Sequence, residues 1–463
     1  MTLFSDRADT GPRAAPMAAP DDPQAGPADG TSDRSPDGAA GEIRSLARPL
    51  ASPDDLAPLI DRVSAARLVC IGEASHGTHE YYSWRAQLSR RLIEEHGFTW
   101  IGVEGDWPDC WRINRWVRGL ADQDLDARGL LARFERWPTW MWANQDVAEF
   151  LTWLRAYNVA RPAQQRAGFY GLDVYSLWDS LWQVMTWLEA HAPDAMPAAL
   201  RAWRCFLPFG EDPHRYARST RLIPASCEPD VVALLVEVRR RTRDRTEDAF
   251  DTAQNAEVAA NAEHYYRTMV RGDRESWNIR DHHMADTIDR IAHHLGARSR
   301  GLIWEHNTHV GDARGTDMAR HGMVNVGQLV RERHAAGGTA LVGFAGHRGS
   351  VLAASSWGTP EQVFPVPEAR PGSHEDLLHQ VLGRPAVLVF GADRSGPWLS
   401  ARAGHRAIGV VYDPQHEAGN YVPTCIGQRY DALIWLEQTT ALRPLHHEGR
   451  PHEPELETEP TGF

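Results

Sequence analysis

The sequence predicts an α/β protein in which a largely parallel central sheet is flanked by helices, with a helical lobe covering the cleft at the carboxyl ends of the strands. Two observations predict this fold class. Short apolar or β-branched runs of strand length recur along the chain, and polar residues follow each of the first five. Long stretches of helical pattern lie around the third of these runs.

The predicted strands cover residues 67–72, 99–103, 167–172, 301–304 and 340–345, with two further runs at 386–390 and 407–412. The polar residues that follow the first five runs are Glu73, Glu104, Asp173, the pair Glu305 and His306, and His347. The carboxyl ends of parallel strands meet at one edge of a sheet, where α/β proteins bind their ligands. We therefore expect these side chains to face one cleft.

A helix is predicted between the first two strands, from residue 80 to residue 96, because this segment has helical periodicity and Gly97 can form a left-handed C-cap. The three segments make a βαβ unit, which favours parallel pairing.

The helical lobe is predicted at about 107–295, and its clearest helices cover 251–270 and 276–295. Many of the 18 tryptophans of the chain lie in this stretch. Core packing accounts for most of them, and an aromatic cleft for an apolar ligand needs only a few.

The two ends of the chain differ in composition from the rest. Residues 1–42 contain almost no aliphatic or aromatic side chains and are expected to form a disordered arm, because ordering them would bury too little apolar surface. Residues 446–463 are acidic and rich in proline and are expected to be a disordered tail. The predicted domain therefore covers 43–445.

A cytoplasmic protein is expected, because the N-terminal residues lack a signal-peptide pattern and no apolar run is long enough to span a membrane. The cysteines are five in number, scattered, and without a Cys-x-x-Cys pair, which argues against a disulfide framework or a thiolate zinc site. They are expected to be buried or incidental thiols, at positions Cys70, Cys110, Cys205, Cys227 and Cys425.

Charge and composition exclude several function classes. The formal net charge is −13 and no basic stripe is present, which argues against nucleic acid as a partner. All 49 cationic Lys and Arg positions are arginine. A Walker P-loop, a kinase ATP site and a pyridoxal-phosphate Schiff base all require lysine, so none of these is expected.

The densest cluster of chemically versatile residues is the segment 72–80, which contains Glu73 and His76 between a strand and a helix. An imidazole accepts protons near neutral pH, and a nearby carboxylate raises its basicity and fixes its orientation. The alternative interpretation is that Glu73 caps the following helix and that His76 is one of 22 scattered histidines.

Arg85 lies on the apolar face of the predicted helix, together with Tyr81, Leu88 and Leu92. A buried arginine requires an anionic partner, and Glu73 and Glu104 at the ends of what we expect to be adjacent strands are the candidates. The alternatives are that Arg85 extends to the surface and that Glu104 caps the helix beginning near Pro108.

His306 and His309 are expected to reach the same pocket edge from the fourth strand. The sequence has no Gly-x-Ser-x-Gly elbow and no His-Glu-x-x-His zinc motif, which disfavours a serine hydrolase and a zincin. A divalent metal held by His76, His306, His309 and a carboxylate remains the alternative to metal-free chemistry.

Several motifs together resemble the erythromycin esterase-like family, over about residues 68–445. They are the segments 71–80, 103–109, 114–119, 170–176, 304–309 and 406–412, together with Arg85. The order and spacing of these segments carry the resemblance. The sequence departs from the family pattern at Gly105, where alanine is expected, and at Glu305, where a small residue is expected.

The resemblance implies an α/β core with a helical lobe and a hydrolase that opens esters or lactones. It assigns His76 as the general base for water, with Glu73, Arg85, Glu104 and His306 completing the catalytic site. His309, Asp173 and Trp107 would contact the substrate. Without a covalent intermediate or a cofactor, Arg85 or His306 would stabilise the oxyanion.

The expected partner is thus a small-molecule substrate, with neither nucleic acid nor membrane involved, and the sequence sets no expectation for oligomeric state. The rival function is a protein on the same scaffold that binds a metal or a small molecule and has no macrolide esterase activity.

Overall fold

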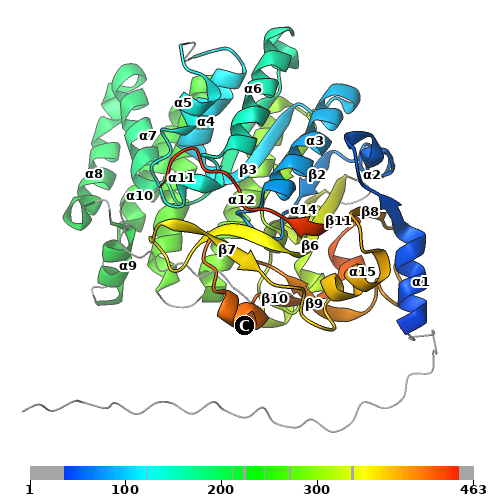
Figure 1. Ribbon diagram of the computed structural model, residues 1–463. Coiled ribbons are helices and arrows are strands. Elements are labelled where there is room, and N and C mark those ends of the chain that lie inside the picture. Colours follow the sequence, from blue (N-terminus) through cyan, green and yellow to red (C-terminus); the bar gives the residue numbers. More distant parts are fainter. Residues whose placement is uncertain are drawn as a thin grey trace, which may run out of the picture.

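The protein is described here from a computed structural model, which covers residues 36–447 except 122–123, 211, 223–225, 245, 271–272 and 335–337. Nine strands form the main sheet (Figure 1). Six of them run parallel in the order β11-β6-β2-β5-β3-β4. Their bounds are β2 Leu68–Ile71, β3 Trp100–Asp106, β4 Gly168–Asp173, β5 Gly301–Trp304, β6 Thr339–Ala354 and β11 Ala432–Thr439.

Antiparallel strands complete the sheet. β8 (Ala386–Val389) pairs with β11, and β1 (Ala47–Pro49) pairs with β8 at the edge. β7 (Glu361–Val366) pairs with the second half of β6. A separate two-stranded ribbon consists of β9 (Arg402–Arg406) and β10 (Tyr421–Cys425). The predicted fold class, an α/β fold with a largely parallel sheet, is therefore confirmed.

Alternate side chains along the central strands enter two different cores, as expected for a sheet covered on both faces. Val69 and Ile71 of β2 pack on one side, whereas Leu68 and Cys70 pack on the other. Helices that contribute to the first core are α2 (Ala57–Val63), α3 (His79–His96), α5 (Ala127–Leu131) and α6 (Gln145–Val159). The second core receives α1 (Pro36–Leu46), α12 (Asp273–Leu295), α14 (Val326–Arg333) and α15 (His374–Leu382), and α4 (Trp107–Val117) contributes to both.

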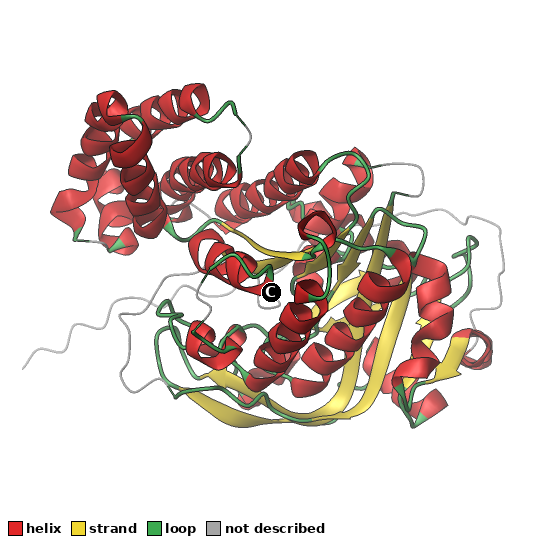
Figure 2. Ribbon diagram, turned by 90° about the horizontal axis from the view of Figure 1, so that it is seen from above, coloured by secondary structure: helices red, strands yellow, loops and turns green. Residues whose placement is uncertain are grey.

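A third core belongs to the helical lobe, which stands apart from the sheet in Figure 2. It is built from α7 (Leu177–His191), α8 (Met196–Phe206), α9 (Pro213–Leu222), α10 (Glu228–Arg241) and α11 (Glu247–Met269). The lobe is shorter than the predicted stretch 107–295, because α4, α5, α6 and α12 pack on the sheet instead. Across the described part of the chain, no helix has the length and apolarity needed to cross a membrane.

The predicted helices are confirmed: residues 80–96 correspond to α3, whose C-cap Gly97 has a φ of 70°, and residues 251–270 and 276–295 correspond to α11 and α12. The strand predicted at 407–412 is wrong. This segment makes only isolated bridges to Ser75 and Ala354, because it leaves the β9 ribbon and runs past the carboxyl ends of the main strands.

Two further expectations are corrected. Residues 36–42, predicted to be disordered, belong to α1, where Glu42 accepts hydrogen bonds from the backbone N–H groups of Trp398 and Leu399. The remainder of the predicted arm and the tail from residue 448 lie outside the described residues. Cys205 and Cys227, expected to be thiols, form a disulfide between α8 and the residue before α10.

The loop from residue 72 to residue 78 depends on the close approach of two glycines to neighbouring segments. A Cβ atom on Gly77 would lie 1.7 Å from the carbonyl oxygen of Leu352 in β6, and one on Gly72 would lie 2.2 Å from Asn307 Oδ1. The Gly77 carbonyl also accepts hydrogen bonds from the N–H groups of Leu352 and Leu442. The absence of side chains thus lets this loop lie directly against the sheet.

Gly77→Ala should destabilise the protein by at least about 2 kcal/mol, because the added methyl group meets backbone atoms that cannot move independently. Gly41→Ala in α1 is the matched control: nothing lies within 4 Å of its added Cβ, so its effect should be neutral or slightly stabilising. Urea unfolding measures both. Equal free energies of unfolding for the Gly77 variant and the wild type would contradict this close packing.

Candidate functional site

The strand order places four predicted site residues in a row at the carboxyl edge of the sheet. Glu73 follows β2, His306 follows β5, Glu104 lies in β3 and Asp173 ends β4. The strands of Glu73 and Glu104 were expected to be neighbours, and this is wrong. β5 comes in between, because the crossover through α3 skips one strand, and it places His306 between the two carboxylates.

Glu73 and His76 form a buried pair in the loop after β2. His76 Nδ1 lies 2.9 Å from Glu73 Oε1, and each side chain is about 1% exposed. The loop is fixed from outside by the Ile408 N–H, which donates to the Ala74 carbonyl at 2.9 Å. Thr78, not Glu73, is the N-cap residue of α3. The alternative interpretation of Glu73 as a helix cap is therefore wrong.

Arg85 is fully buried on α3, as its position on the apolar face predicts, and does not extend to the surface. Its Nη2 lies 3.1 Å from Glu73 Oε2, and its guanidinium carbon lies 4.4 Å from the centre of the Tyr82 ring and 4.8 Å from the Trp304 ring. The prediction of a Glu73 partner is confirmed. The second predicted partner, Glu104, is paired with a different arginine.

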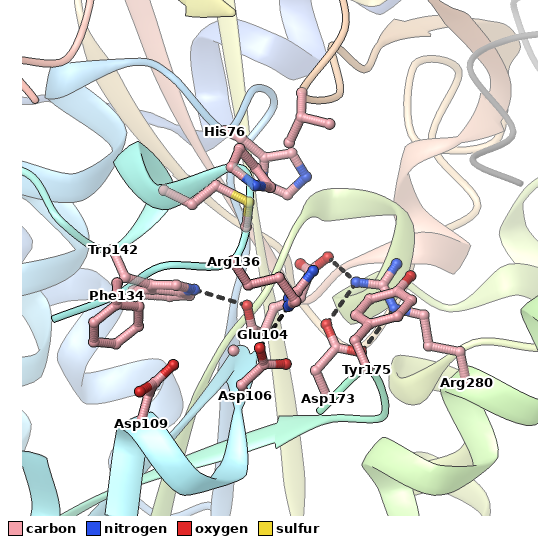
Figure 3. A pocket seen from close by; sticks show the side chains of 14 residues that line it. His76, Glu104, Asp106, Asp109, Phe134, Arg136, Trp142, Asp173, Tyr175 and Arg280 are labelled. Atoms are coloured by element: carbon pink, nitrogen blue, oxygen red, sulfur yellow. Dashed lines mark hydrogen bonds and ion pairs between the residues drawn. The ribbon is translucent and has the colours of Figure 1, made fainter. Parts of the chain in front are cut away.

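That arginine is Arg280 of α12, which the sequence analysis did not identify. Its Nη2 donates to Glu104 Oε1 at 2.7 Å and to Asp173 Oδ2 at 2.8 Å, and its Nε donates to Asp173 Oδ1 at 3.0 Å (Figure 3). All three side chains are at most 7% exposed. Like Arg85, Arg280 shares a helix face with buried apolar residues, here Met284 and Ile291.

The charge of Arg280 lowers the pKa values of two carboxyl groups, those of Asp173 and Glu104. Burial alone would raise the pKa of Asp173, but the Arg280 charge and hydrogen bonds outweigh it and lower this pKa to about 2. Burial also opposes ionisation of Glu104, yet His309 and Arg280 lower its pKa below the ordinary value. Both groups are therefore carboxylates at neutral pH.

His309 contacts both Arg280 and Glu104 in this cluster. Its Nδ1 lies 3.0 Å from Asp281, its Nε2 lies 3.2 Å from Arg280 Nη1 and 3.4 Å from Glu104 Oε1, and its ring stacks on Trp277 with the centres 4.5 Å apart. Burial opposes protonation, but Asp281 and Glu104 together raise the pKa of His309. His309 is thus anchored on both ring nitrogens.

His306 is the N-cap residue of α13 (Asn307–Val310), and its Nδ1 accepts a hydrogen bond from the Thr308 N–H. Its backbone N–H donates to Glu104 Oε2 at 2.8 Å, and its ring centre lies 4.7 Å from that of His76. Burial, followed by the nearby His76, lowers the pKa of His306 well below the usual range. With Nδ1 as the acceptor, the neutral ring carries its proton on Nε2, and the Ala74 backbone also interacts with this ring.

A pocket opens beside this row, and His76 points into it (Figure 3). Its lining comes from the ends of the parallel strands and the loops after them, the start of α4, the segment 134–142, Arg280 and the segment that follows β9. The lining residues are His76, Glu104, Gly105, Asp106, Asp109, Phe134, Arg136, Pro138, Met141, Trp142, Asp173, Tyr175, Arg280 and Val410.

Trp107, expected to contact the substrate, does not line this pocket. It is fully buried, its Nε1 donates to Asp251 Oδ1 at 2.8 Å, and its ring stacks on Trp111. Trp107 is the first residue of α4, and the N-cap of this helix is Asp106 rather than Glu104. The aromatic residues that line the pocket are instead Phe134, Tyr175 and Trp142, and Trp142 Nε1 donates to the Glu104 carbonyl at 2.8 Å.

Asp106, Asp109 and Arg136 also line the pocket and were missed by the sequence analysis. Arg136 donates a hydrogen bond to Asp106. Burial and the Asp106 carboxylate raise the pKa of Asp109 to about 7, and Arg112 opposes this shift. The two aspartates follow Glu104 in the motif 104–109, so their proximity to the strand end was the available signal.

The ligand atoms of His76, His306 and His309 do not converge on one point. Among the residues that the structure describes, the one group of three with ligand atoms close enough for a metal ion lies elsewhere. His309 has both ring nitrogens engaged by Asp281, Glu104 and Arg280. This geometry gives no support to the three-histidine metal site that the sequence left open.

Comparison with known families now adds to this geometry. Residues 93–439, about three quarters of the chain, match the family model of erythromycin esterase. The chain belongs to the erythromycin esterase family. The matched range includes Glu104, Arg280 and His306, and it begins after Glu73, His76 and Arg85.

Two curated proteins are similar in sequence. An erythromycin esterase type II of Escherichia coli is 31% identical over 121 residues, which is 26% of this chain and 26% of that protein. The match therefore spans about a quarter of the esterase. The putative hydrolase YbfO of Bacillus subtilis (strain 168) is 21% identical over 438 residues, which is 86% of this chain and 90% of that protein.

Three solved structures share the fold. A Bacillus cereus protein has a TM-score of 0.73 at 18% identity, covering 89% of this chain and 99% of its own. A succinoglycan biosynthesis protein has a TM-score of 0.71 at 19% identity, covering 90% and 100%. A histidine-to-asparagine mutant of the erythromycin esterase EreC, in its open conformation, has a TM-score of 0.62 at 17% identity, covering 84% and 95%.

The depressed pKa of Asp173 predicts a pH dependence of stability. Because its folded-state pKa of about 2 lies below the ordinary value of 3.8, Asp173 stabilises the fold above about pH 4 and loses this contribution as the pH falls to about 2. Asp173→Asn removes the titrating group. Between pH 5 and pH 2 the wild type should therefore lose about 2 kcal/mol more unfolding free energy than the variant.

Urea unfolding at several pH values measures this difference. Parallel pH profiles for the wild type and Asp173→Asn would show that Arg280 does not hold Asp173 in its ionised form.

Proposed function

We propose that this protein hydrolyses a carboxylic ester or lactone of a small molecule, with His76 as the general base that activates water. The observation that carries the proposal is the buried Glu73–His76 pair, 2.9 Å apart, with His76 at the wall of a pocket. Membership of the erythromycin esterase family and the hydrolase named among its relatives support the same reaction class.

Glu73 fixes the reactive form of His76. A carboxylate that accepts the Nδ1–H of an imidazole leaves the lone pair on Nε2, from which it can take a proton from water. The Glu73 carboxylate is in turn paired with Arg85, whose charge favours its ionised form. Glu73 therefore orients His76 and stabilises the imidazolium formed when water attacks the carbonyl carbon.

His306 is the group that we assign to the oxyanion. Its neutral ring carries a proton on Nε2, and its centre lies 4.7 Å from the His76 ring. Such an N–H donor interacts most strongly when negative charge develops on the carbonyl oxygen. Arg85, the alternative from the sequence, is enclosed by the Tyr82 and Trp304 rings and is already paired with Glu73.

Glu104, Arg280 and Asp173 act as positioning residues in this scheme. Glu104 holds the His306 backbone N–H at 2.8 Å, and Arg280 holds Glu104 at 2.7 Å. A displacement of either partner would move His306 relative to His76, and reaction rates respond strongly to misplacement of about 1 Å. Asp109, with a pKa of about 7, is available to donate a hydrogen bond to the substrate.

Direct attack by water fits the neighbouring hydroxyl groups better than a serine nucleophile does. Ser75 Oγ forms a short hydrogen bond with Thr78 Oγ1 inside the loop. Since Ser75 also directly precedes His76 in the chain, it is poorly placed to form the usual bond between a nucleophile and its base. The proposed reaction therefore passes through a tetrahedral intermediate without an acyl-enzyme, and no metal takes part in it.

His76→Asn should lower kcat by about 10²–10⁴-fold, because it removes the base while keeping a polar side chain of similar size. Glu73→Gln should lower kcat with little change in KM, because it disturbs the orientation and charge of the imidazole rather than substrate binding. A panel of esters, lactones and macrolides assayed by mass spectrometry identifies the substrate, and steady-state kinetics with it then measures both effects.

His79→Asn is the matched control, since His79 lies three residues away, is 46% exposed and pairs with Asp146 outside the pocket. It should retain wild-type kinetics. Circular dichroism verifies that each variant is folded. Full activity of a folded His76→Asn variant would refute the role of His76. A ligand that binds in the pocket without any product across the whole panel would favour the rival binding function.

A further inference from the structure

Three residues with metal-ligating side chains meet outside the pocket. His347 lies in β6, His379 in α15 and Glu437 in β11. Figure 1 shows these three elements side by side, on the part of the sheet next to β8. One ligand atom from each residue lies within 4.8 Å of the other two. None of the three residues lines the pocket beside His76.

We propose that His347, His379 and Glu437 bind a divalent transition cation of the zinc class. Two imidazoles and one carboxylate form a ligand set that Zn²⁺ accepts, with water in the fourth position of a tetrahedron. Among divalent cations, imidazole nitrogen selects zinc and its neighbours over magnesium and calcium, which prefer oxygen ligands only. The three ligands come from separate elements, so their convergence is a product of the fold.

Unsatisfied polar atoms point to a ligand at this place. His347 is 2% exposed, and its Nε2 has no hydrogen-bond partner among the described residues. Glu437 Oε2 is also buried without such a partner in the same part of the structure. A buried polar atom without a partner costs about 1–3 kcal/mol. A single cation between the three side chains would satisfy both atoms.

The contacts already present in the cluster show which side chain must move. His379 Nδ1 lies 2.5 Å from Glu437 Oε1, and the rings of His347 and His379 lie face to face, with centres 3.8 Å apart and planes 2° from parallel. A metal binds imidazole in the plane of the ring, so one of two parallel rings must turn. The His379 side chain is 41% exposed and has room to do so, whereas His347 is held in the interior.

Coordination through His347 Nε2 also moves the ring proton to Nδ1. This nitrogen now accepts a long contact of 3.4 Å from the Ala369 N–H. A bond of that length contributes little, so its loss is small beside the metal–nitrogen bond formed. The binding event therefore consists of a turn of His379, loss of the His379–Glu437 contact and a proton shift on His347.

A cation at this site would join α15 to two parallel strands of the sheet. The same helix carries Glu375, which accepts hydrogen bonds from His405 Nδ1 and from the Arg406 N–H. Binding of the metal is expected to raise the unfolding temperature, because a ligand that binds only the folded state stabilises that state.

The test uses full-length protein without a histidine tag, stripped with a chelator and titrated with Zn²⁺ by calorimetry. One zinc per chain is expected to bind and to raise the unfolding temperature. His379→Ala and Glu437→Gln should each weaken this binding at least about tenfold. His379 is half-exposed and Gln is isosteric with Glu, so both variants should fold, and if one fails the other decides.

Matched variants separate this site from the pocket and from surface histidines. His416→Ala, at an 83% exposed position, and His76→Asn should keep the wild-type zinc affinity. Anomalous diffraction from a zinc-soaked crystal should place the ion between the three side chains. The proposal is overturned if no zinc binds, if zinc affinity is unchanged in His379→Ala and Glu437→Gln, or if His76→Asn abolishes binding.

Discussion

The structure of the site depends on the buried guanidinium of Arg280, which joins the ends of two strands. Glu104 of β3 and Asp173 of β4 both bind it, and both carboxylate side chains are about 2% exposed. Two carboxylates this close would repel one another without a cation, and at least one would become protonated. Removing one member of such a buried pair costs about 3–5 kcal/mol, which explains how α12 is held against the carboxyl edge of the sheet.

Two arginines therefore divide the row of site residues into two electrostatic systems. Arg85 serves the Glu73–His76 pair, and Arg280 serves Glu104 and Asp173. His306 lies between them, with its backbone bound by Glu104 and its ring beside that of His76. In the proposed function, the first system orients His76 as the base, and the second fixes the position of His306 as the N–H donor. Under the proposed function, this separation allows a base and an electrophile to coexist within 4.7 Å.

The sequence predicted the fold class and most strands, because buried parallel strands appear as short apolar runs with polar residues behind them. It failed at 407–412, where an equally apolar run packs between segments without joining a sheet. It also overlooked β11, although 432–436 is such a run. The order of the strands could not be predicted from local sequence patterns, since nothing within 301–304 indicates that this strand inserts between β2 and β3.

The site was predictable in part for the same reason. Glu73, His76 and His306 follow strands closely and Glu104 lies near the end of β3, so their positions along the chain revealed them. Arg280 lies 107 residues from its partner Asp173, and only its place on an apolar helix face distinguished it. Trp107 shows the opposite error. Its position within the motif at the strand end suggested a pocket contact, but its side chain packs in the core on the sheet face that α12 and α14 cover.

A double-mutant cycle between Arg280→Met and Asp173→Asn, followed by urea unfolding at neutral pH, tests the central claim most directly. If the guanidinium and the carboxylate act as one unit, the double variant should be more stable than the sum of the single effects implies, by about 2 kcal/mol or more. Effects that add to within about 0.5 kcal/mol would show that the two groups stabilise the site independently and would contradict the account.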